Sequence, residues 1–136
     1  MDKKALILVV DDNSECRALL VWALELHGFR TISATCGREA VELAIKLQPR
    51  LVLTDISMPD INGYEATQAI HAHPRGRNIP VVAVSADCVE SRYGSTDFNG
   101  DFIACLGKPW DEEALLHIVR EVLSGGVKPS EWFQHA

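Results

Sequence analysis

Two short apolar runs that end close to aspartate residues constrain the fold of this chain more than any other feature of its sequence. Residues 6–10 read LILVV before Asp11 and Asp12, and residues 51–54 read LVLT before Asp55. A strand with one solvated face alternates apolar and polar residues, whereas a strand buried on both faces does not. The sequence therefore predicts a parallel sheet covered by helices on both sides, with acids at the carboxyl ends of buried strands.

The rest of the chain alternates between helical spacing and further apolar runs. Additional strands are predicted over residues 31–34, 81–84 and 102–106, and apolar residues at helical spacing predict helices between the strands and after the last one. The weakest helix prediction is the segment Cys88–Asn99, because its glycine, serine and threonine residues lower helix propensity. The other helices are predicted over about residues 14–27, 38–47 and 64–71, and from about residue 111 to Gly125.

Five strands that alternate with helices predict an α/β sandwich with a parallel sheet. The chain has 136 residues and 47% hydrophobic content, which suits one domain with a two-sided core. We expect that domain over residues 1–125 and a short C-terminal tail over residues 126–136. The expected sheet brings the carboxyl ends of all its strands to one rim, where α/β proteins place their ligands and their chemistry.

The net charge and the spacing of the cysteines limit which partners and which cellular compartment we expect for the protein. A formal net charge of -6 argues against binding to nucleic acid or to an anionic membrane. No apolar stretch is long enough to cross a bilayer, and the first run is too short for a signal peptide. The four cysteines form no CxxC pair, which favours reduced, buried thiols in a cytoplasmic protein.

The predicted strand ends gather an unusual set of polar side chains. Asp11 and Asp12, Asp55, Ser85 and Lys108 follow the first, third, fourth and fifth strands. Three neighbouring carboxylates repel one another, and a hard divalent cation such as Mg²⁺ relieves that repulsion. Asp55 could then attack phosphorus as a nucleophile, while Lys108 and Ser85 hold the transferred group.

Each of these residues also has a plainer interpretation. A lone aspartate at a strand end is more often a helix cap, Ser85 could be an ordinary turn hydroxyl, and Lys108 a surface lysine. The five histidines show no metal-ligand spacing and are interpreted as surface or helix-end residues. Trp22 and Trp110 are expected to pack against the body of the protein. The coincidence of four strand ends favours the chemical interpretation.

The residues at the strand ends occur in one order and with particular neighbours. They are Asp11 and Asp12, Asp55 with Met58, Pro59 and Gly63 of an M-P-x-x-x-G segment, Ser85 with Ala86, and Lys108 with Pro109. This set resembles the receiver domain of two-component response regulators, and the resemblance covers about residues 4–123. It implies a flavodoxin-like, doubly wound sheet of strand order 2-1-3-4-5.

The resemblance also implies roles for the individual residues. Asp55 would accept a phosphoryl group from a histidine kinase or a histidine phosphotransfer protein. Mg²⁺ would be bound by Asp12, Asp55 and the backbone carbonyl of Ser57, with Asp11 acting through water. Ser85 and Lys108 would hold the phosphoryl oxygens, and the peptide bond between Lys108 and Pro109 would be cis.

Such a protein signals through altered contacts with a downstream protein, and catalyses at most its own phosphorylation and dephosphorylation. It would be a monomer or a phosphorylation-dependent dimer. Cys105 stands where the family usually has an aromatic residue that turns inward on activation, which keeps open a binding module that ignores phosphorylation. A receiver excised from a hybrid kinase or larger regulator is another alternative.

Two enzyme or cofactor classes fit less well. A phosphatase with an aspartate nucleophile is expected to show D-x-D after the first strand, where this chain has D-D-N. A flavin-binding flavodoxin needs backbone amides and hydroxyls around a phosphate, whereas the first loop, DDNSE, offers carboxylates.

Overall fold

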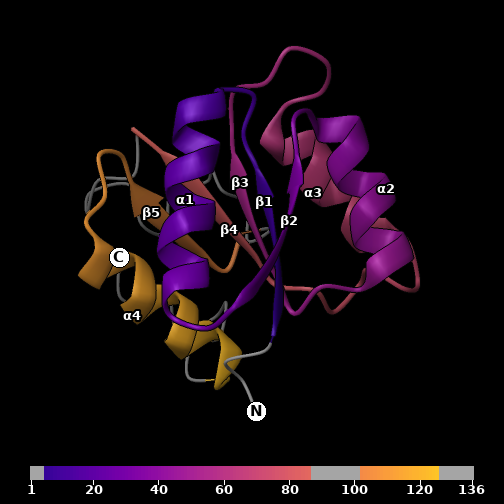
Figure 1. The fold of residues 1–136 in the computed structure, drawn as a ribbon. Coiled ribbons are helices and arrows are strands. Elements are labelled where there is room, and N and C mark those ends of the chain that lie inside the picture. The colour runs from indigo at the N-terminus through magenta and orange to yellow at the C-terminus, as the bar shows by residue number, and fades with distance from the viewer. Residues whose placement is uncertain (1–4, 87–101, 126–136) are drawn as a thin grey trace.

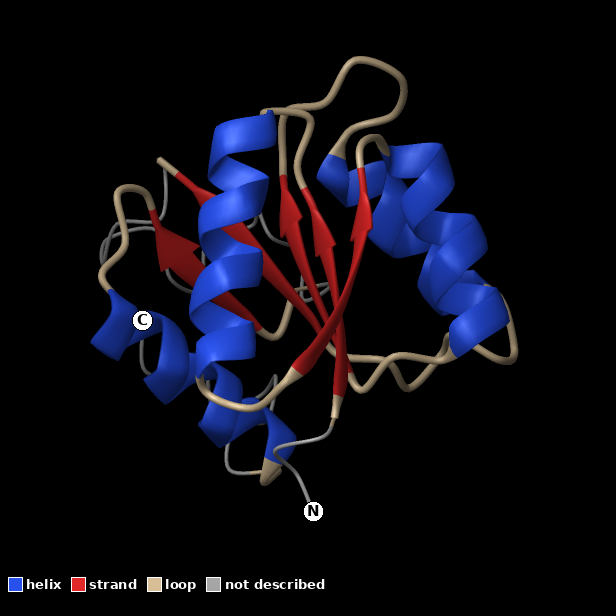
Figure 2. Ribbon diagram, in the orientation of Figure 1, coloured by secondary structure: helices blue, strands red, loops and turns tan. Residues whose placement is uncertain are grey.

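The computed structural model describes residues 5–86 and 102–125. Strands and helices alternate along this part of the chain (Figures 1 and 2). They are β1 (Leu6–Val10), α1 (Ser14–Leu26), β2 (Arg30–Ala34), α2 (Gly37–Leu47), β3 (Leu51–Asp55), α3 (Gly63–Ala72), β4 (Val81–Ser85), β5 (Ala104–Gly107) and α4 (Glu112–Leu123). The helix predicted over Cys88–Asn99 and the predicted tail lie outside the described residues.

The five strands form one parallel sheet in the order β2-β1-β3-β4-β5, so the predicted flavodoxin-like topology is confirmed. β1 lies between β2 and β3, with Leu8 opposite Ile32 on one side and Val52 on the other. Because every strand runs in the same direction, all carboxyl ends meet at one rim of the sheet.

The helices cover both faces of the sheet, α1 and α4 on one and α2 and α3 on the other (Figure 2). Successive residues of β1 point into different cores. Ile7 and Val9 pack with residues of α1 and α4, whereas Leu8 and Val10 pack with residues of α2 and α3. All four side chains are fully buried, which explains why this strand shows no apolar-polar alternation.

The last strand differs from its prediction. The apolar run at residues 102–106 predicted a strand that starts at Phe102, but β5 starts at Ala104. Phe102 is nevertheless buried, and its ring packs on Tyr64 with 5.3 Å between centroids. Phe102 therefore belongs to the apolar run because it is buried, although it lies in the loop before the strand. A hydrophobic pattern does not distinguish a buried loop residue from a residue paired in a strand.

The interpretation of Trp22 as a packing residue is wrong, whereas Trp110 packs against the core as expected. Trp22 is 59% exposed, and Leu19, which also follows the helical spacing, is 57% exposed. Helix α1 is apolar on more than one side, and its buried side is formed by Leu20, Ala23 and Leu24. A helix with apolar residues around much of its circumference does not reveal from spacing alone which side faces the sheet.

The expectation of four reduced, buried thiols is only partly met. Cys16, in the first turn of α1, and Cys36, at the N-cap of α2, are free but partly exposed. Cys105 is buried in β5, as expected, but is disulfide-bonded rather than reduced. Cys88 lies outside the described residues.

Candidate functional site

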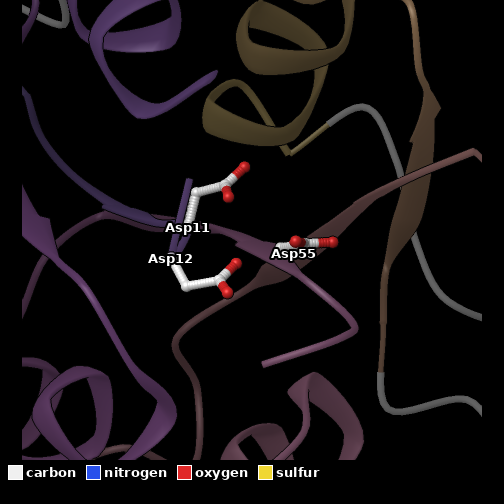
Figure 3. A group of neighbouring side chains, drawn as sticks. All are labelled: Asp11, Asp12 and Asp55. Atoms are coloured by element: carbon white, nitrogen blue, oxygen red, sulfur yellow. The ribbon is translucent and has the colours of Figure 1, made fainter. Parts of the chain in front are cut away.

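Three carboxylates converge at the carboxyl rim of the sheet. Asp11 and Asp12 directly follow β1, and Asp55 is the last residue of the neighbouring strand β3. One oxygen of each carboxylate lies within 4.8 Å of the others. Figure 3 shows the side chains of Asp11 and Asp12 extending toward Asp55. Across the described residues, this is the one group of His, Cys, Asp and Glu side chains arranged closely enough to hold a metal ion.

Asp11 is the most firmly held of the three acids. Its residue is only 1% exposed, and its Oδ1 accepts a hydrogen bond from the amide of Asn13 at 2.9 Å. The backbone of Asp11 is held as well. Its amide donates a hydrogen bond to the carbonyl of Ala34 at 3.2 Å, and its carbonyl accepts one from Arg17 Nη1 at 2.7 Å. The loop after β1 thus fixes this carboxylate before any ligand binds.

Lys108 brings a positive charge to the same place from the end of β5. Its Nζ lies 3.2 Å from Asp11 Oδ2 and 3.7 Å from Asp55 Oδ2. Burial alone would lower the pKa of this ammonium, but attraction to Asp55 and the hydrogen bond to Asp11 outweigh that effect and raise it. The peptide bond between Lys108 and Pro109 is cis, which confirms the expectation.

The surroundings of Asp55 have opposing effects on the pKa of its carboxyl group. Burial raises the pKa of its carboxyl group, and the negative charges of Asp11 and Asp12 raise it further. Lys108 and a 2.8 Å hydrogen bond from the Ile56 amide to Oδ1 act in the opposite direction but do not cancel the rise. A single ammonium against three carboxylates leaves the site with surplus negative charge. Oxygen donors with this surplus are the donor set that suits Mg²⁺.

The loop after β3, residues 56–62, closes tightly behind Asp55. The amide of Gly63 donates to the carbonyl of Ile56 at 2.7 Å. A Cβ atom at Gly63 would lie 2.5 Å from the carbonyl oxygen of Asp55 and 2.9 Å from Ile56 Cα, so only glycine permits this approach. This contact gives a physical reason for the glycine of the M-P-x-x-x-G segment.

Ser85 and Ser57 occupy different positions at the rim. Ser85 is the last residue of β4 and is 8% exposed. It lies opposite Gly107 of β5, the residue that precedes Lys108. The Lys108 amide donates to the Ser85 carbonyl at 3.0 Å. Ser57 lies two residues after Asp55 and is exposed. The rim therefore brings together residues from the ends of four strands, including Asp11 and Lys108, which are 97 positions apart.

Three polar residues near the site were given no role in the sequence analysis. Asn62 and Glu65 form a capping box at the start of α3, and the spacing N-x-x-E signals such a box. Asp60 accepts hydrogen bonds from the amides of Gly37 and Arg38 at the start of α2. No short-range pattern predicts that contact, because its partners lie more than 20 positions away.

A doubly wound sheet of this strand order, with acids, a hydroxyl and a lysine at its carboxyl rim, defines a receiver-type signalling domain. The chain belongs to the response regulator receiver domain family, whose family model matches residues 7–120. This family consists of the receiver domains of two-component systems, which generally serve in signalling rather than as enzymes.

Individual relatives agree with this assignment. Protein PilH of Pseudomonas aeruginosa is 36% identical over 127 residues, covering 89% of this chain and 99% of PilH. The chemotaxis response regulator CheY4 of Vibrio cholerae has the same fold, with a TM-score of 0.80 and 24% identity over 88% of this chain and 98% of CheY4.

Another solved structure is the receiver domain of the sensor histidine kinase PA1611 of P. aeruginosa. It aligns with a TM-score of 0.80 and 25% identity, covering 89% of this chain and 98% of that domain, and it has a magnesium ion coordinated in its active site cleft. Within residues 5–86 and 102–125, no helix combines the length and apolarity required to cross a membrane.

Proposed function

We propose that this protein is a phosphorylatable response regulator in which Asp55 accepts a phosphoryl group from the phosphohistidine of a histidine kinase or a histidine phosphotransfer protein. The observation that carries the proposal is the convergence of Asp11, Asp12 and Asp55, with the Nζ of Lys108 3.2 Å from Asp11 and 3.7 Å from Asp55. Under this proposal residues 1–125 form the receiver unit, and the protein works in the cytoplasm.

The surplus negative charge at the rim supports a Mg²⁺ requirement. Asp12, Asp55 and the Ser57 carbonyl would hold the ion, with Asp11 acting through water. When bound, Mg²⁺ would neutralise charge on the phosphoryl oxygens. The hydrogen bond from Asn13 and the contact with Lys108 keep Asp11 in place for this role.

The transfer step uses groups that the chain already holds at the rim. A carboxylate oxygen of Asp55 forms a bond to phosphorus as the bond between phosphorus and the imidazole nitrogen of the donor breaks, and the nitrogen keeps the electron pair. Lys108, 3.7 Å from Asp55 Oδ2, balances charge on the transferred group. Ser85, at the end of the adjacent strand, would donate a hydrogen bond to one phosphoryl oxygen. Later attack by water releases phosphate and restores the carboxylate.

The surface beside Lys108 suits a donor that is itself a protein. A largely apolar pocket there is lined by Cys16, Leu19, Trp22, Lys108, Pro109 and Trp110. Leu19, Trp22 and Leu26 lie along α1 and are each more than half exposed. Because Lys108 borders both this pocket and the acids, a protein that covers the pocket is placed next to Asp55.

A second candidate is a receiver-like binding module that works without phosphorylation. The observation that favours it is Cys105, a small buried residue at the position where the family usually has a mobile aromatic side chain. Such a module would bind its target through constant contacts, and its acids would be dispensable for that binding.

The experiment that separates the two candidates is intact mass spectrometry after incubation with acetyl phosphate and Mg²⁺. The phosphorylatable regulator gains the mass of one phosphoryl group, and the gain is absent in Asp55→Asn and in wild type treated with a chelator. A wild-type protein that gains no mass from acetyl phosphate, nor from a panel of phosphorylated histidine proteins, supports the binding module instead.

A further inference from the structure

Helix α2 takes its N-terminal cap from a distant loop. The residue at its N-cap position, Cys36, makes no side-chain capping hydrogen bond. Instead, Asp60 Oδ1 accepts from the Gly37 amide at 3.0 Å and Asp60 Oδ2 accepts from the Arg38 amide at 2.8 Å. The other helices are capped locally, by Asn13, Asn62 and Asp111. Asp60 therefore connects α2 to the loop that follows Asp55.

The loop and the helix start are packed together as well as hydrogen-bonded. A Cβ atom at Gly37 would lie 2.5 Å from Ile61 Cγ1 and 2.6 Å from the Ile61 carbonyl oxygen. The absence of a side chain at Gly37 thus lets Asp60 and Ile61 approach the helix. The guanidinium of Arg38 adds little to this contact, because its Nε is 4.0 Å from Asp60 Oδ2 and its side chain is 77% exposed.

The same loop carries groups that belong to the site. Its first residue, Ile56, donates its amide to Asp55 Oδ1 and accepts from Gly63 through its carbonyl. Ser57 follows directly, with the backbone carbonyl that we assign to Mg²⁺. The loop is thus tied at its base by the hydrogen bond between Ile56 and Gly63, and near its far end by Asp60.

We propose that Asp60 is a positioning residue for phosphorylation, which holds the 56–62 loop on α2 and so keeps the Ser57 carbonyl and the Asp55 carboxylate in the arrangement that binds Mg²⁺. This inference rests on the proposed function. Asp60 is not one of the three clustered acids, so it acts through the backbone of the loop. Groups that orient metal ligands from outside commonly change metal affinity by about 10- to 100-fold when removed.

The test compares Asp60→Ala with Glu39→Ala as a matched control. Glu39 lies in the first turn of the same helix, and its Oε1 accepts hydrogen bonds from the amide and the hydroxyl of Thr35, at 2.8 and 3.1 Å, rather than from α2 itself. Isothermal titration should show Mg²⁺ binding weakened by about 10-fold in Asp60→Ala and unchanged in the control. In the metal-free protein, amide exchange at Gly63 should accelerate only in Asp60→Ala.

Two further variants separate positioning from a general loss of stability. Asp60→Asn keeps one acceptor oxygen and should recover part of the Mg²⁺ affinity. Gly37→Ala keeps Asp60 but pushes Ile61 away, and should weaken Mg²⁺ binding in the same way as Asp60→Ala. The inference is overturned if wild type binds Mg²⁺ and accepts phosphoryl while Asp60→Ala matches the Glu39→Ala control. A wild type that does neither contradicts the proposed function itself, and the inference with it.

Discussion

The carboxyl group of Asp55 lies where ionisation is unfavourable in the metal-free protein. Burial raises its pKa above 3.8, and two neighbouring acids add to the effect. Since the folded-state pKa lies above the unfolded value, the stabilising contribution of this group is fully present below that unfolded value. It is lost as the pH rises through the folded-state pKa. At neutral pH, ionised Asp55 therefore opposes folding.

We predict that Asp55→Asn stabilises the metal-free protein at pH 7, because a neutral amide of the same shape removes the unfavourable burial of a charge and the repulsion from Asp11 and Asp12, which together outweigh the lost attraction to Lys108. Below the unfolded pKa of Asp55 the advantage should disappear. Urea denaturation at several pH values measures both effects. Mg²⁺ should then stabilise wild type more than Asp55→Asn, since a ligand that binds only the folded state adds to stability. A variant less stable than wild type at pH 7 without metal would contradict this explanation.

At the scale of helices and strands, the loop after β3 combines several local requirements. Gly63 must lack a side chain, Asn62 caps α3, and Asp60 caps α2. The capping box consists of a hydrogen bond from the Glu65 amide to Asn62 Oδ1 at 2.9 Å and one from the Asn62 amide to Glu65 Oε1 at 3.0 Å. One short loop therefore connects the site to two helices on the same face of the sheet.

Removal of the Asn62 cap should lower the stability of the fold without changing the charges of the site. We expect Asn62→Ala to reduce the free energy of unfolding by about 1 kcal/mol, the usual effect of losing an N-cap. Chemical denaturation measures this change, and Asn62→Asp, which retains an acceptor, should remain close to wild type. Equal stability of Asn62→Ala and wild type would show that the capping box contributes little.

The elements differ in how well their sequence predicts them. Strand β1 was predicted over its full length, because burial on both faces leaves an uninterrupted apolar run. The acid cluster was also predictable, since parallel topology brings strand ends together whatever their distance along the chain. The outward side of α1 and the start of β5 were not predictable, because apolarity does not specify the contact partner. The Asp60 cap joins segments more than 20 residues apart, and no local pattern encodes it.

At the scale of the whole molecule, the charged site at the rim of the sheet lies next to an apolar surface on α1. Lys108 contacts two acids of the cluster and also borders the pocket lined by Leu19 and Trp22. A small phosphodonor needs only the site at the rim, whereas a protein donor also covers the neighbouring surface. The two kinds of donor should therefore respond differently to changes on α1.

We predict that Trp22→Ala leaves labelling by acetyl phosphate unchanged and slows transfer from a phosphorylated histidine protein that labels wild type. An exposed side chain of this kind is expected to change stability by less than about 0.5 kcal/mol, so the fold should be retained. The matched control is Leu47→Ala, which removes another exposed apolar side chain from α2, on the opposite face of the sheet. Equal slowing by both variants, or by neither, would contradict a donor surface on α1.

Locating the modified residue tests whether Asp55 is the phosphoacceptor. Protein incubated with acetyl phosphate and Mg²⁺ is reduced with borohydride, which converts an aspartyl phosphate to homoserine, then digested with trypsin and sequenced by mass spectrometry. We predict homoserine at position 55, in the peptide over residues 51–75, and unmodified aspartate at positions 11, 12 and 60. Homoserine at any of those three positions, with Asp55 unmodified, would contradict the account.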